Sequence, residues 1–242
     1  MLTVAYDGTN YHGYQIQKNG ITIEEVLTGA LCDLTGENIV ITGGSRTDAG
    51  VHALSNMVVF DTEARMPGEK YSYALNQRLP LDIRILKSEE VSLDFHPRHC
   101  NSKKTYEYRI LNAEFLNPVK RLYYHHVYVP LSIEKMQEAS KFLVGEHDFT
   151  SFCSAGAQVE SKVRTIYDIS ISKKDDDITI SVTGNGFLYN MVRIIAGTLI
   201  EVGRGSITPE EITSIIEAKD REAAGPTAPA CGLCLMKYEF EE

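Results

Sequence analysis

The stretch NIVITGGSRTDAGVHALSNMVVFD, residues 38–61, joins two apolar runs through a short charged loop. The runs at 38–42 and 56–61 are rich in valine and isoleucine and predict two strands. Between them, Gly43 and Gly44 allow a sharp turn and a close approach of another molecule to the backbone. Loops on a rigid scaffold carry much of protein chemistry, so this loop is a candidate active site.

Three side chains that can do chemistry lie close together in this loop. Arg46, Asp48 and His52 fall within seven residues. One interpretation is a reactive carboxylate beside a cation. The other is a polar turn held by a structural Arg–Asp pair. The local sequence does not decide between them.

Outward from this loop, strand and helix patterns alternate along the whole chain. Each half predicts the order strand, helix, two strands, helix, strand. In the first half the elements are a strand at 2–6, a helix from Thr22, strands at 38–42 and 56–61, a helix opened by Pro67, and a strand at 83–91. In the second half they are a strand at 105–111, a helix from Ser132, strands at 164–172 and 177–183, a helix at 187–202, a further helix from Thr208, and a strand ending near Phe240.

This order predicts an α+β fold in which two ferredoxin-like halves form a mostly antiparallel sheet with helices packed on it. No low-complexity linker divides the halves, and the polar residues 101–104 are the most plausible seam between them. We therefore expect an N-terminal half at 1–100, which carries the charged loop, and a C-terminal half at 101–242. An active-site cleft is expected between the two halves.

Composition places the chain among ordinary globular proteins, with 43% hydrophobic residues among 242. No apolar run approaches the roughly 20 residues of a membrane span. The first eight residues already contain a charge and a turn, unlike a secretory signal. The five cysteines form no disulfide framework, and Cys231 and Cys234 are interpreted as inert strand cysteines rather than a metal or redox pair. We expect a cytoplasmic protein with no metal.

The net charge of −9 argues only weakly against binding of nucleic acid, because the distribution of charge matters more than its sum. Acidic residues crowd segments with a solvated character, whereas basic residues gather near the candidate site. The basic residues in question are Arg46, Lys103, Lys104, Arg109, Lys120, Arg121, Arg164, Arg193 and Arg204. An acidic body with a basic cleft fits this pattern.

Eight blocks in order along the chain resemble the tRNA pseudouridine synthase A family. They are YDGT at 6–9, GYQIQ at 13–17, RTDAGVHA at 46–53, FHPR at 95–98, KTYEYR at 104–109, HDFTSF at 147–152, NGFLYNMVR at 185–193 and TAPACGL at 227–233. Two departures are visible: the family usually has glycine where Ser45 stands and tryptophan where Tyr14 stands. Neither departure involves the acidic residue of the loop.

The resemblance implies an isomerase that converts uridine to pseudouridine at positions 38–40 of the tRNA anticodon stem-loop. The base is detached from its ribose, turned and rejoined through carbon, without a cofactor. The family works as a homodimer with one tRNA across both subunits. The chain agrees with cofactor-free chemistry, since its sequence contains no glycine-rich nucleotide loop and no cluster of metal ligands.

The resemblance also implies roles for single residues. Asp48 is the catalytic carboxylate, which Arg193 holds charged and aimed. Tyr106 stacks on the target uracil, and Arg46 fills the space of the flipped base or holds a phosphate. His52 either orders the loop or touches RNA. Contacts to phosphate are expected from Lys103, Lys104, Arg109 and Arg164, for each of which a solvated surface position is the alternative.

Two other functional classes stay open from sequence alone. One is a non-catalytic RNA-binding or tRNA-folding protein on the same scaffold. The other is a nucleoside hydrolase or glycosidase that uses Asp48. Retaining glycosidases need a second carboxylate about 5 Å away, and Asp7 and Asp148 are the candidates for it.

Overall fold

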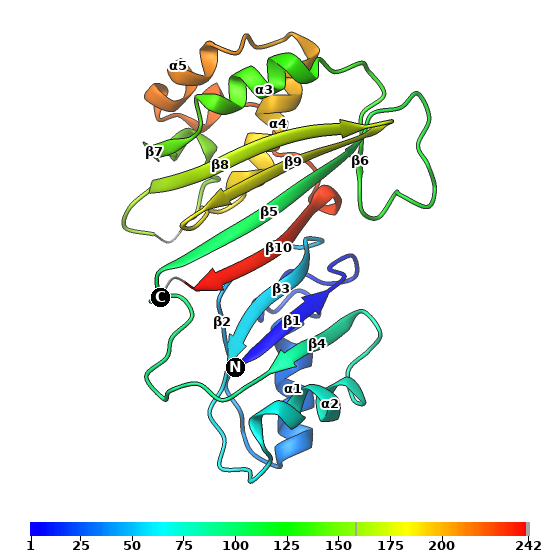
Figure 1. Ribbon diagram of the computed structural model, residues 1–242, viewed down its shortest axis with the longest axis vertical. Coiled ribbons are helices and arrows are strands. Elements are labelled where there is room, and N and C mark those ends of the chain that lie inside the picture. The colour runs from blue at the N-terminus through cyan, green and yellow to red at the C-terminus, as the bar shows by residue number, and fades with distance from the viewer. Residues whose placement is uncertain (158, 241–242) are drawn as a thin grey trace. The chain divides into compact units, whose positions relative to one another are not determined.

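The computed structural model describes residues 1–157 and 159–240, which form two compact units (Figure 1). Unit 1 comprises Met1–Ser102 together with the chain from Cys234 onward, and unit 2 comprises Lys103–Leu233. The described residues contain ten strands and five α-helices, and most strand pairs are antiparallel. The predicted mixed α+β class is confirmed.

Unit 1 is built on β1, which pairs antiparallel with β4 on one side and β3 on the other. Both β2 and β10 pair with β3, β2 antiparallel at Val58 and Val59 and β10 parallel at His52 and Ala53. The bounds are β1 Leu2–Tyr6, β2 Thr42–Gly43, β3 His52–Val59, β4 Ile83–Ser88 and β10 Leu233–Phe240. The order β4-β1-β3-β2 is that of a ferredoxin-like fold, as expected for the first half.

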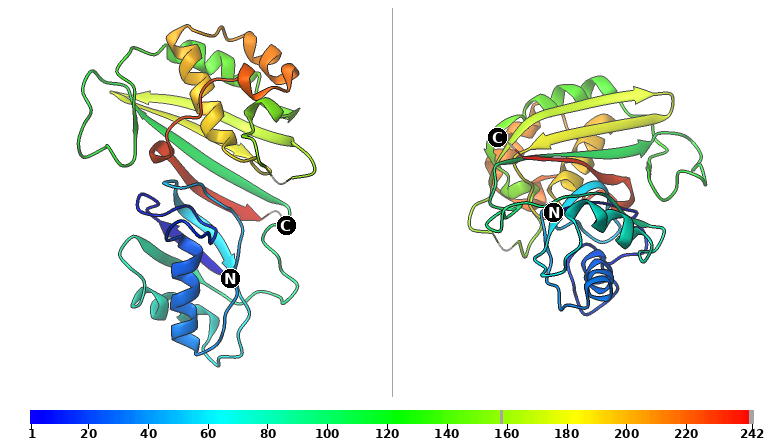
Figure 2. Two further views of the ribbon diagram at one scale, coloured as in Figure 1. Left: turned by 180° about the vertical axis from the view of Figure 1, so that it is seen from behind. Right: turned by 60° about the horizontal axis from the view of Figure 1, so that its bottom comes forward.

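Helix α1 (Ile23–Thr35) begins where the capping pattern predicts it. The side chain of Thr22 accepts a hydrogen bond from the backbone N–H of Glu25 at 3.3 Å, and Gly36 ends the helix with φ at +74°. The helix covers one face of the unit 1 strands, and it lies in front of them in the left view of Figure 2. A 3₁₀ turn at Gly68–Lys70 leads into α2 (Tyr71–Asn76), which packs on β4.

Unit 2 contains a four-stranded antiparallel sheet in the order β5-β9-β8-β7, and a short strand β6 runs parallel to β5. Its strands are β5 Ser102–Leu111, β6 His125–His126, β7 Gly145–Asp148, β8 Val163–Lys174 and β9 Asp177–Gly184. Its α-helices are α3 Ile133–Lys141, α4 Met191–Arg204 and α5 Glu211–Ala218, and its 3₁₀ turns are Thr150–Phe152, Arg221–Ala223 and Ala230–Gly232. Helix α3 packs on both α4 and β8.

The structure differs from the expected elements in several places. The strand expected at 38–42 is reduced to the two residues of β2, Thr42–Gly43, and the short strands β6 and β7 were not expected from the sequence. Strand β10 belongs to unit 1 through its pairing with β3, whereas the sequence interpretation placed all of 101–242 in the second half. Strand β3 begins at His52 rather than at 56. Helix α4 begins at Met191 rather than 187, because Asn190 has a left-handed backbone with φ at +60°.

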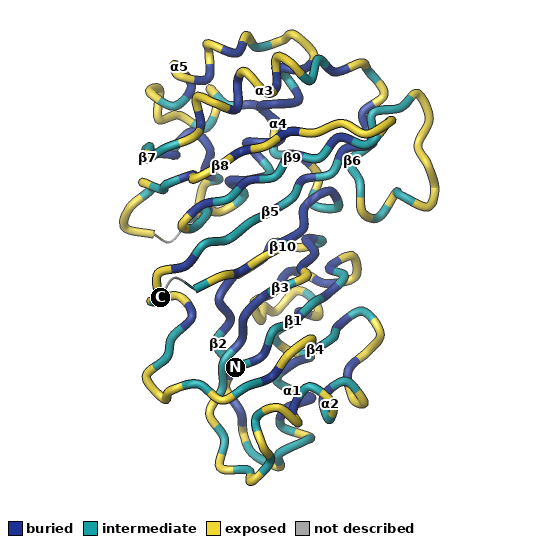
Figure 3. The backbone as a smooth tube through the Cα atoms, in the orientation of Figure 1, coloured by how far each residue is buried: buried dark blue, intermediate teal, exposed yellow. Residues whose placement is uncertain are grey.

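Buried residues are concentrated on the strands and on the inward faces of the helices (Figure 3). In β5 the side chains of Tyr106, Tyr108 and Ile110 are buried and alternate with half-buried neighbours, which confirms the predicted common face. Among the described residues, no helix has both the length and the apolar character to cross a membrane.

Candidate active site

The charged loop of unit 1 connects β2 to β3 and turns its side chains alternately outward and inward. Arg46 is exposed and Asp48 is partly exposed, while Thr47 between them is buried. The Thr47 hydroxyl lies 2.8 Å from the hydroxyl of Tyr6 on β1. With Thr47 anchored inward, the loop can present Arg46 and Asp48 together on its outer side.

Backbone hydrogen bonds fix this loop to the segment that follows β1. Tyr14 N–H donates to Thr47 O at 3.0 Å, and Gly50 N–H donates to Tyr11 O at 3.2 Å. Gly13 has φ at +87°, and a Cβ there would lie 2.9 Å from Thr47 O. Only glycine allows this approach without strain, which explains the Gly13 of the motif.

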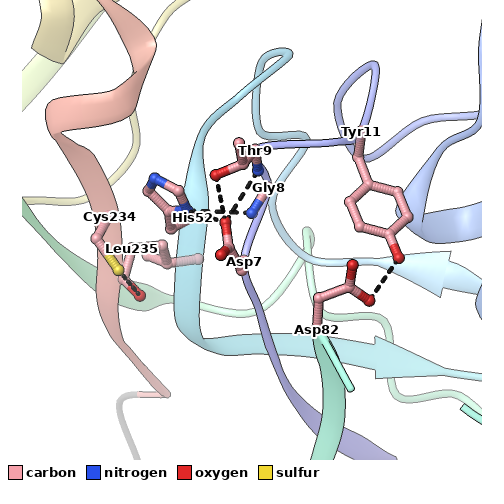
Figure 4. A network of polar contacts seen from close by, with 8 residues as sticks. All are labelled: Asp7, Gly8, Thr9, Tyr11, His52, Asp82, Cys234 and Leu235. Carbon is pink, nitrogen blue, oxygen red and sulfur yellow. Dashed lines mark hydrogen bonds and ion pairs between the residues drawn. The ribbon is translucent and has the colours of Figure 1, made fainter. Parts of the chain in front are cut away.

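His52 joins the start of β3 to the turn after β1 (Figure 4). Its Nδ1 lies 3.1 Å both from the N–H of Gly8 and from Oδ1 of Asp7. An unprotonated Nδ1 accepts from Gly8, and a protonated Nδ1 donates to Asp7. The same Asp7 oxygen accepts from the backbone and hydroxyl of Thr9. His52 is buried, with 6% of its surface exposed, and its contacts hold the start of β3 to the turn after β1.

The two departures from the family pattern both place a hydroxyl in the interior. Tyr14 and Ser45 are 1% and 6% exposed, and neither side-chain oxygen has a hydrogen-bond partner among the described residues. The Tyr14 ring lies against Gly43, where a Cβ would be 2.4 Å from the ring. A buried hydroxyl without a partner lowers stability, since its hydration is lost without replacement.

We therefore expect Tyr14→Phe to raise the free energy of unfolding by about 1 kcal/mol, because it removes a desolvated hydroxyl and keeps the ring. The matched control is Tyr11→Phe, since Tyr11 donates to Asp82 Oδ1 at 2.7 Å and should lose about 1 kcal/mol. Urea denaturation of both variants measures the difference. A loss of stability in Tyr14→Phe as large as in Tyr11→Phe would contradict this interpretation.

In unit 2, Tyr106 lies on β5 opposite Val182 of β9. Its ring meets Phe187 edge to face, with centroids 5.3 Å apart. The pleat places Lys104 on the same face of the strand, because the two residues are separated by one position.

Two of the expected phosphate contacts lie on the opposite face of β5 from Tyr106. The ammonium of Lys103 is 5.3 Å from the centre of the Tyr167 ring. Arg109 donates to Glu107 Oε2 at 2.9 Å, so part of its charge is compensated within the strand. The structure therefore separates Lys103 and Arg109 from Lys104, which the sequence had grouped with them.

Arg193 lies in the first turn of α4 and is held by its own unit. Its Nε donates to Ala228 O and its Nη1 donates to Asn190 Oδ1, both at 2.8 Å. In return, the N–H of Ala228 donates to the carbonyl of Arg193 at 3.1 Å. These bonds fix the orientation of the guanidinium plane. The guanidinium of a solvated arginine has no such fixed orientation. Arg164 donates to carbonyls of its own segment, Ser161 O and Val163 O.

Sequence reasoning missed a set of buried polar groups beneath the loop, namely Tyr6, Thr47 and Asn56. One signal was available: Asn56 stands directly before the apolar residues Met57, Val58 and Val59 of β3 and is buried with the first two of them. Among the described residues, no three His, Cys, Asp or Glu side chains are grouped as metal ligands. The described cysteines are all free.

Comparison with known proteins identifies the family of this chain. A family model described as "tRNA pseudouridine synthase" matches residues 2–99 and 139–241. These segments contain Asp48 and Arg193, whereas Tyr106 lies in the interval between them.

Named relatives cover that interval as well. A tRNA pseudouridine synthase A from Thermoanaerobacter sp. (strain X514) is 48% identical over 240 residues, which is 99% of this chain and 98% of the relative. One from Ruminiclostridium cellulolyticum is 51% identical with the same coverage. A "tRNA pseudouridine synthase A 2" from Clostridium tetani is 51% identical over 99% of this chain and 97% of the relative. With the family model matched over most of its length and half of its residues shared with such relatives, the chain belongs to the tRNA pseudouridine synthase family.

Proposed function

We propose that this protein isomerises uridine to pseudouridine in tRNA, at positions 38–40 of the anticodon stem-loop, with Asp48 as the catalytic carboxylate. The observation that carries the proposal is the anchored loop, which presents Asp48 beside Arg46 in a chain about half identical to named synthases. No group donor enters the reaction, so the protein's own side chains supply the catalytic groups.

The reaction exchanges one bond for another within the nucleotide. The C1′–N1 bond breaks, the base turns, and a C1′–C5 bond forms. The hydrogen of C5 leaves as a proton, and N1 ends protonated, so atoms and charge balance. Asp48 can stabilise or attack the sugar, attack the base, or remove a ribose proton. Each route requires an ionised carboxylate.

The partners of Asp48 are proposed from the family resemblance. Arg193 supplies a cation that favours the ionised carboxylate. Its guanidinium is already oriented by Ala228 and Asn190, which supports a positioning role. Tyr106 supplies a ring for stacking of the detached uracil, and stacking contributes about 1–3 kcal/mol per base. The exposed Arg46 assists flipping of the base out of its stem.

The alternatives receive less support. The relatives carry synthase names, which does not favour a non-catalytic RNA-binding protein. A glycosidase needs a carboxyl group that stays protonated as the acid. Of the two candidates, Asp148 accepts from Thr150 and pairs with Lys219, and these contacts lower the pKa of Asp148. Asp7 is occupied by Thr9 and His52.

The assembly and location of the enzyme are part of the same proposal. We place it in the cytoplasm, where the free cysteines would stay reduced and its tRNA substrate is found. We propose a homodimer, which the exposed apolar side chains of Phe115, Leu116 and Val119 in unit 2 support. Light scattering of the purified protein measures the subunit number.

The activity is tested with purified protein and tRNA labelled with tritium at C5 of uridine. We expect release of one tritium per modified site from tRNA with uridine at 38–40, because formation of the C1′–C5 bond expels that hydrogen. Free uridine should release none. Tritium release from the free nucleoside at a comparable rate, or cleavage to free uracil, would overturn the proposal in favour of a nucleoside enzyme.

A further inference from the structure

The side-chain amide of Asn56 makes the backbone hydrogen bonds that a neighbouring strand would otherwise make to Ser45, the first residue of the charged loop, which we call the catalytic loop. Asn56 lies on β3 with none of its surface exposed. Backbone hydrogen bonding between β2 and β3 continues to Gly44, whose N–H donates to Met57 O at 2.7 Å. At the next position the Asn56 amide takes over: Oδ1 accepts from Ser45 N–H at 3.1 Å, and Nδ2 donates to Ser45 O at 2.9 Å.

The second hydrogen of the same amide extends this contact to the other side of Arg46. Asn56 Nδ2 donates to the Tyr6 hydroxyl at 3.3 Å, and that hydroxyl lies 2.8 Å from Thr47 Oγ1. Burial raises the pKa of Tyr6, so the phenol keeps its proton. Because the phenol oxygen accepts from Asn56, its hydrogen is available for Thr47. One buried amide thus fixes both Ser45 and Thr47.

We propose that Asn56 and Tyr6 are positioning residues that set the direction in which Arg46 and Asp48 leave the loop. This inference rests on the proposed function, in which Asp48 is the catalytic carboxylate. Ser45 and Thr47 flank Arg46, and Thr47 directly precedes Asp48, so a shift of either moves both functional side chains. A misplacement of about 1 Å can reduce turnover about 10²-fold.

The chemistry of the amide explains why a side chain of this type stands there. Ser45 offers one donor and one acceptor, and Tyr6 offers a further acceptor. Only a carboxamide presents one acceptor and two donors on a single rigid plane. A carboxylate at this position would face Ser45 O with a negative charge. An aliphatic side chain would remove the partner of the Ser45 N–H and of the Ser45 carbonyl and would leave the Tyr6 hydroxyl with Thr47 alone.

The chain supplies a matched control in Asn76, at the end of α2. Its Oδ1 accepts from Ile85 N–H at 2.8 Å, and its Nδ2 donates to Ile85 O at 2.9 Å. The same pair of bonds therefore holds a strand of the same unit, through Ile85 of β4 and not through Ser45 of the charged loop. Removing Asn76 tests the structural effect of losing such a pair.

The experiment compares Asn56→Ala, Tyr6→Phe and Asn76→Ala at a temperature where each is folded. Three quantities are measured: kcat from tritium release at saturating tRNA, Kd for tRNA, and the midpoint of urea denaturation. We expect kcat to fall about 10²-fold in Asn56→Ala and about tenfold in Tyr6→Phe, with Kd changed less than threefold. Asn76→Ala should lower the midpoint as Asn56→Ala does and keep the kcat of the unchanged protein.

Equal kcat in Asn56→Ala and Asn76→Ala would overturn the inference, as would a loss in Asn56→Ala that appears only in Kd. Tyr6→Phe keeps the ring and its packing, so it decides the outcome if Asn56→Ala does not fold. Asp48→Asn, assayed beside them, separates this inference from the proposed function. An active Asp48→Asn contradicts the proposed function, whereas an inactive Asp48→Asn beside a fully active Tyr6→Phe and Asn56→Ala contradicts only the positioning role.

Discussion

Asp48→Asn is expected to abolish formation of pseudouridine, with kcat lowered at least about 10⁴-fold, a loss typical of removing a catalytic nucleophile or base. The amide has nearly the same shape as the carboxylate, so the backbone bonds of the loop to Tyr14 and Tyr11 should be kept. What is lost is the negative charge that each route of bond exchange requires. Tritium release from labelled tRNA measures the loss.

Binding of tRNA is the control for this variant. Because the substitution removes a negative charge, the Kd for tRNA should stay the same or decrease, as phosphate repulsion is reduced. A variant that has lost tRNA binding would show that the loop collapsed instead of losing its chemistry. Activity in Asp48→Asn within tenfold of the unchanged protein would remove Asp48 from the catalytic role.

Arg193→Lys is expected to lower kcat about 10²–10³-fold, the effect of removing one oriented donor from an active site. Lysine keeps the charge but has no planar fork, so it cannot donate to Ala228 O and Asn190 Oδ1 as the guanidinium does. The lysine ammonium would therefore not be held in a fixed direction, and it would not extend as far from the helix as the guanidinium does.

Arg193→Met extends the test to pH. A carboxylate that loses a cationic neighbour binds its proton up to a higher pH. Because the reaction needs the ionised carboxylate, the acidic limb of kcat should move to higher pH, and activity should be lost earlier as the pH falls. An acidic limb at the same pH in Arg193→Met would show that Arg193 does not act on Asp48. Arg204→Met, at the far end of the same helix, serves as the control.

Local signals in the sequence predict much of this fold because they act over a few residues. Thr22 and Glu25 mark the start of α1, and alternation along β5 assigns the buried face with Tyr106 and Tyr108. The start of α4 was predicted too early, since the left-handed conformation of Asn190 leaves no trace in the apolar spacing. The pairing of β10 with β3 joins residues about 180 positions apart, which periodicity cannot detect.

The site divides in the same way. The resemblance predicts Arg46 and Asp48 as functional residues, since catalysis depends on the residue type, which the sequence contains. Their side chains lie on the outer side of the loop. The support beneath them depends on geometry: the Asn56 amide is recognised as a backbone partner only once Ser45 is placed beside it. Likewise, the burial of His52 and its contact with Gly8 depend on how the chain folds, and the sequence alone does not give them.

The most direct test of the central claim maps pseudouridine in tRNA from cells that lack this protein and from the same cells supplied with it. The account predicts that pseudouridine at positions 38–40 disappears without the protein, returns with the unchanged chain, and stays absent with Asp48→Asn. Pseudouridine that persists at these positions without the protein, or that returns fully with Asp48→Asn, would contradict it.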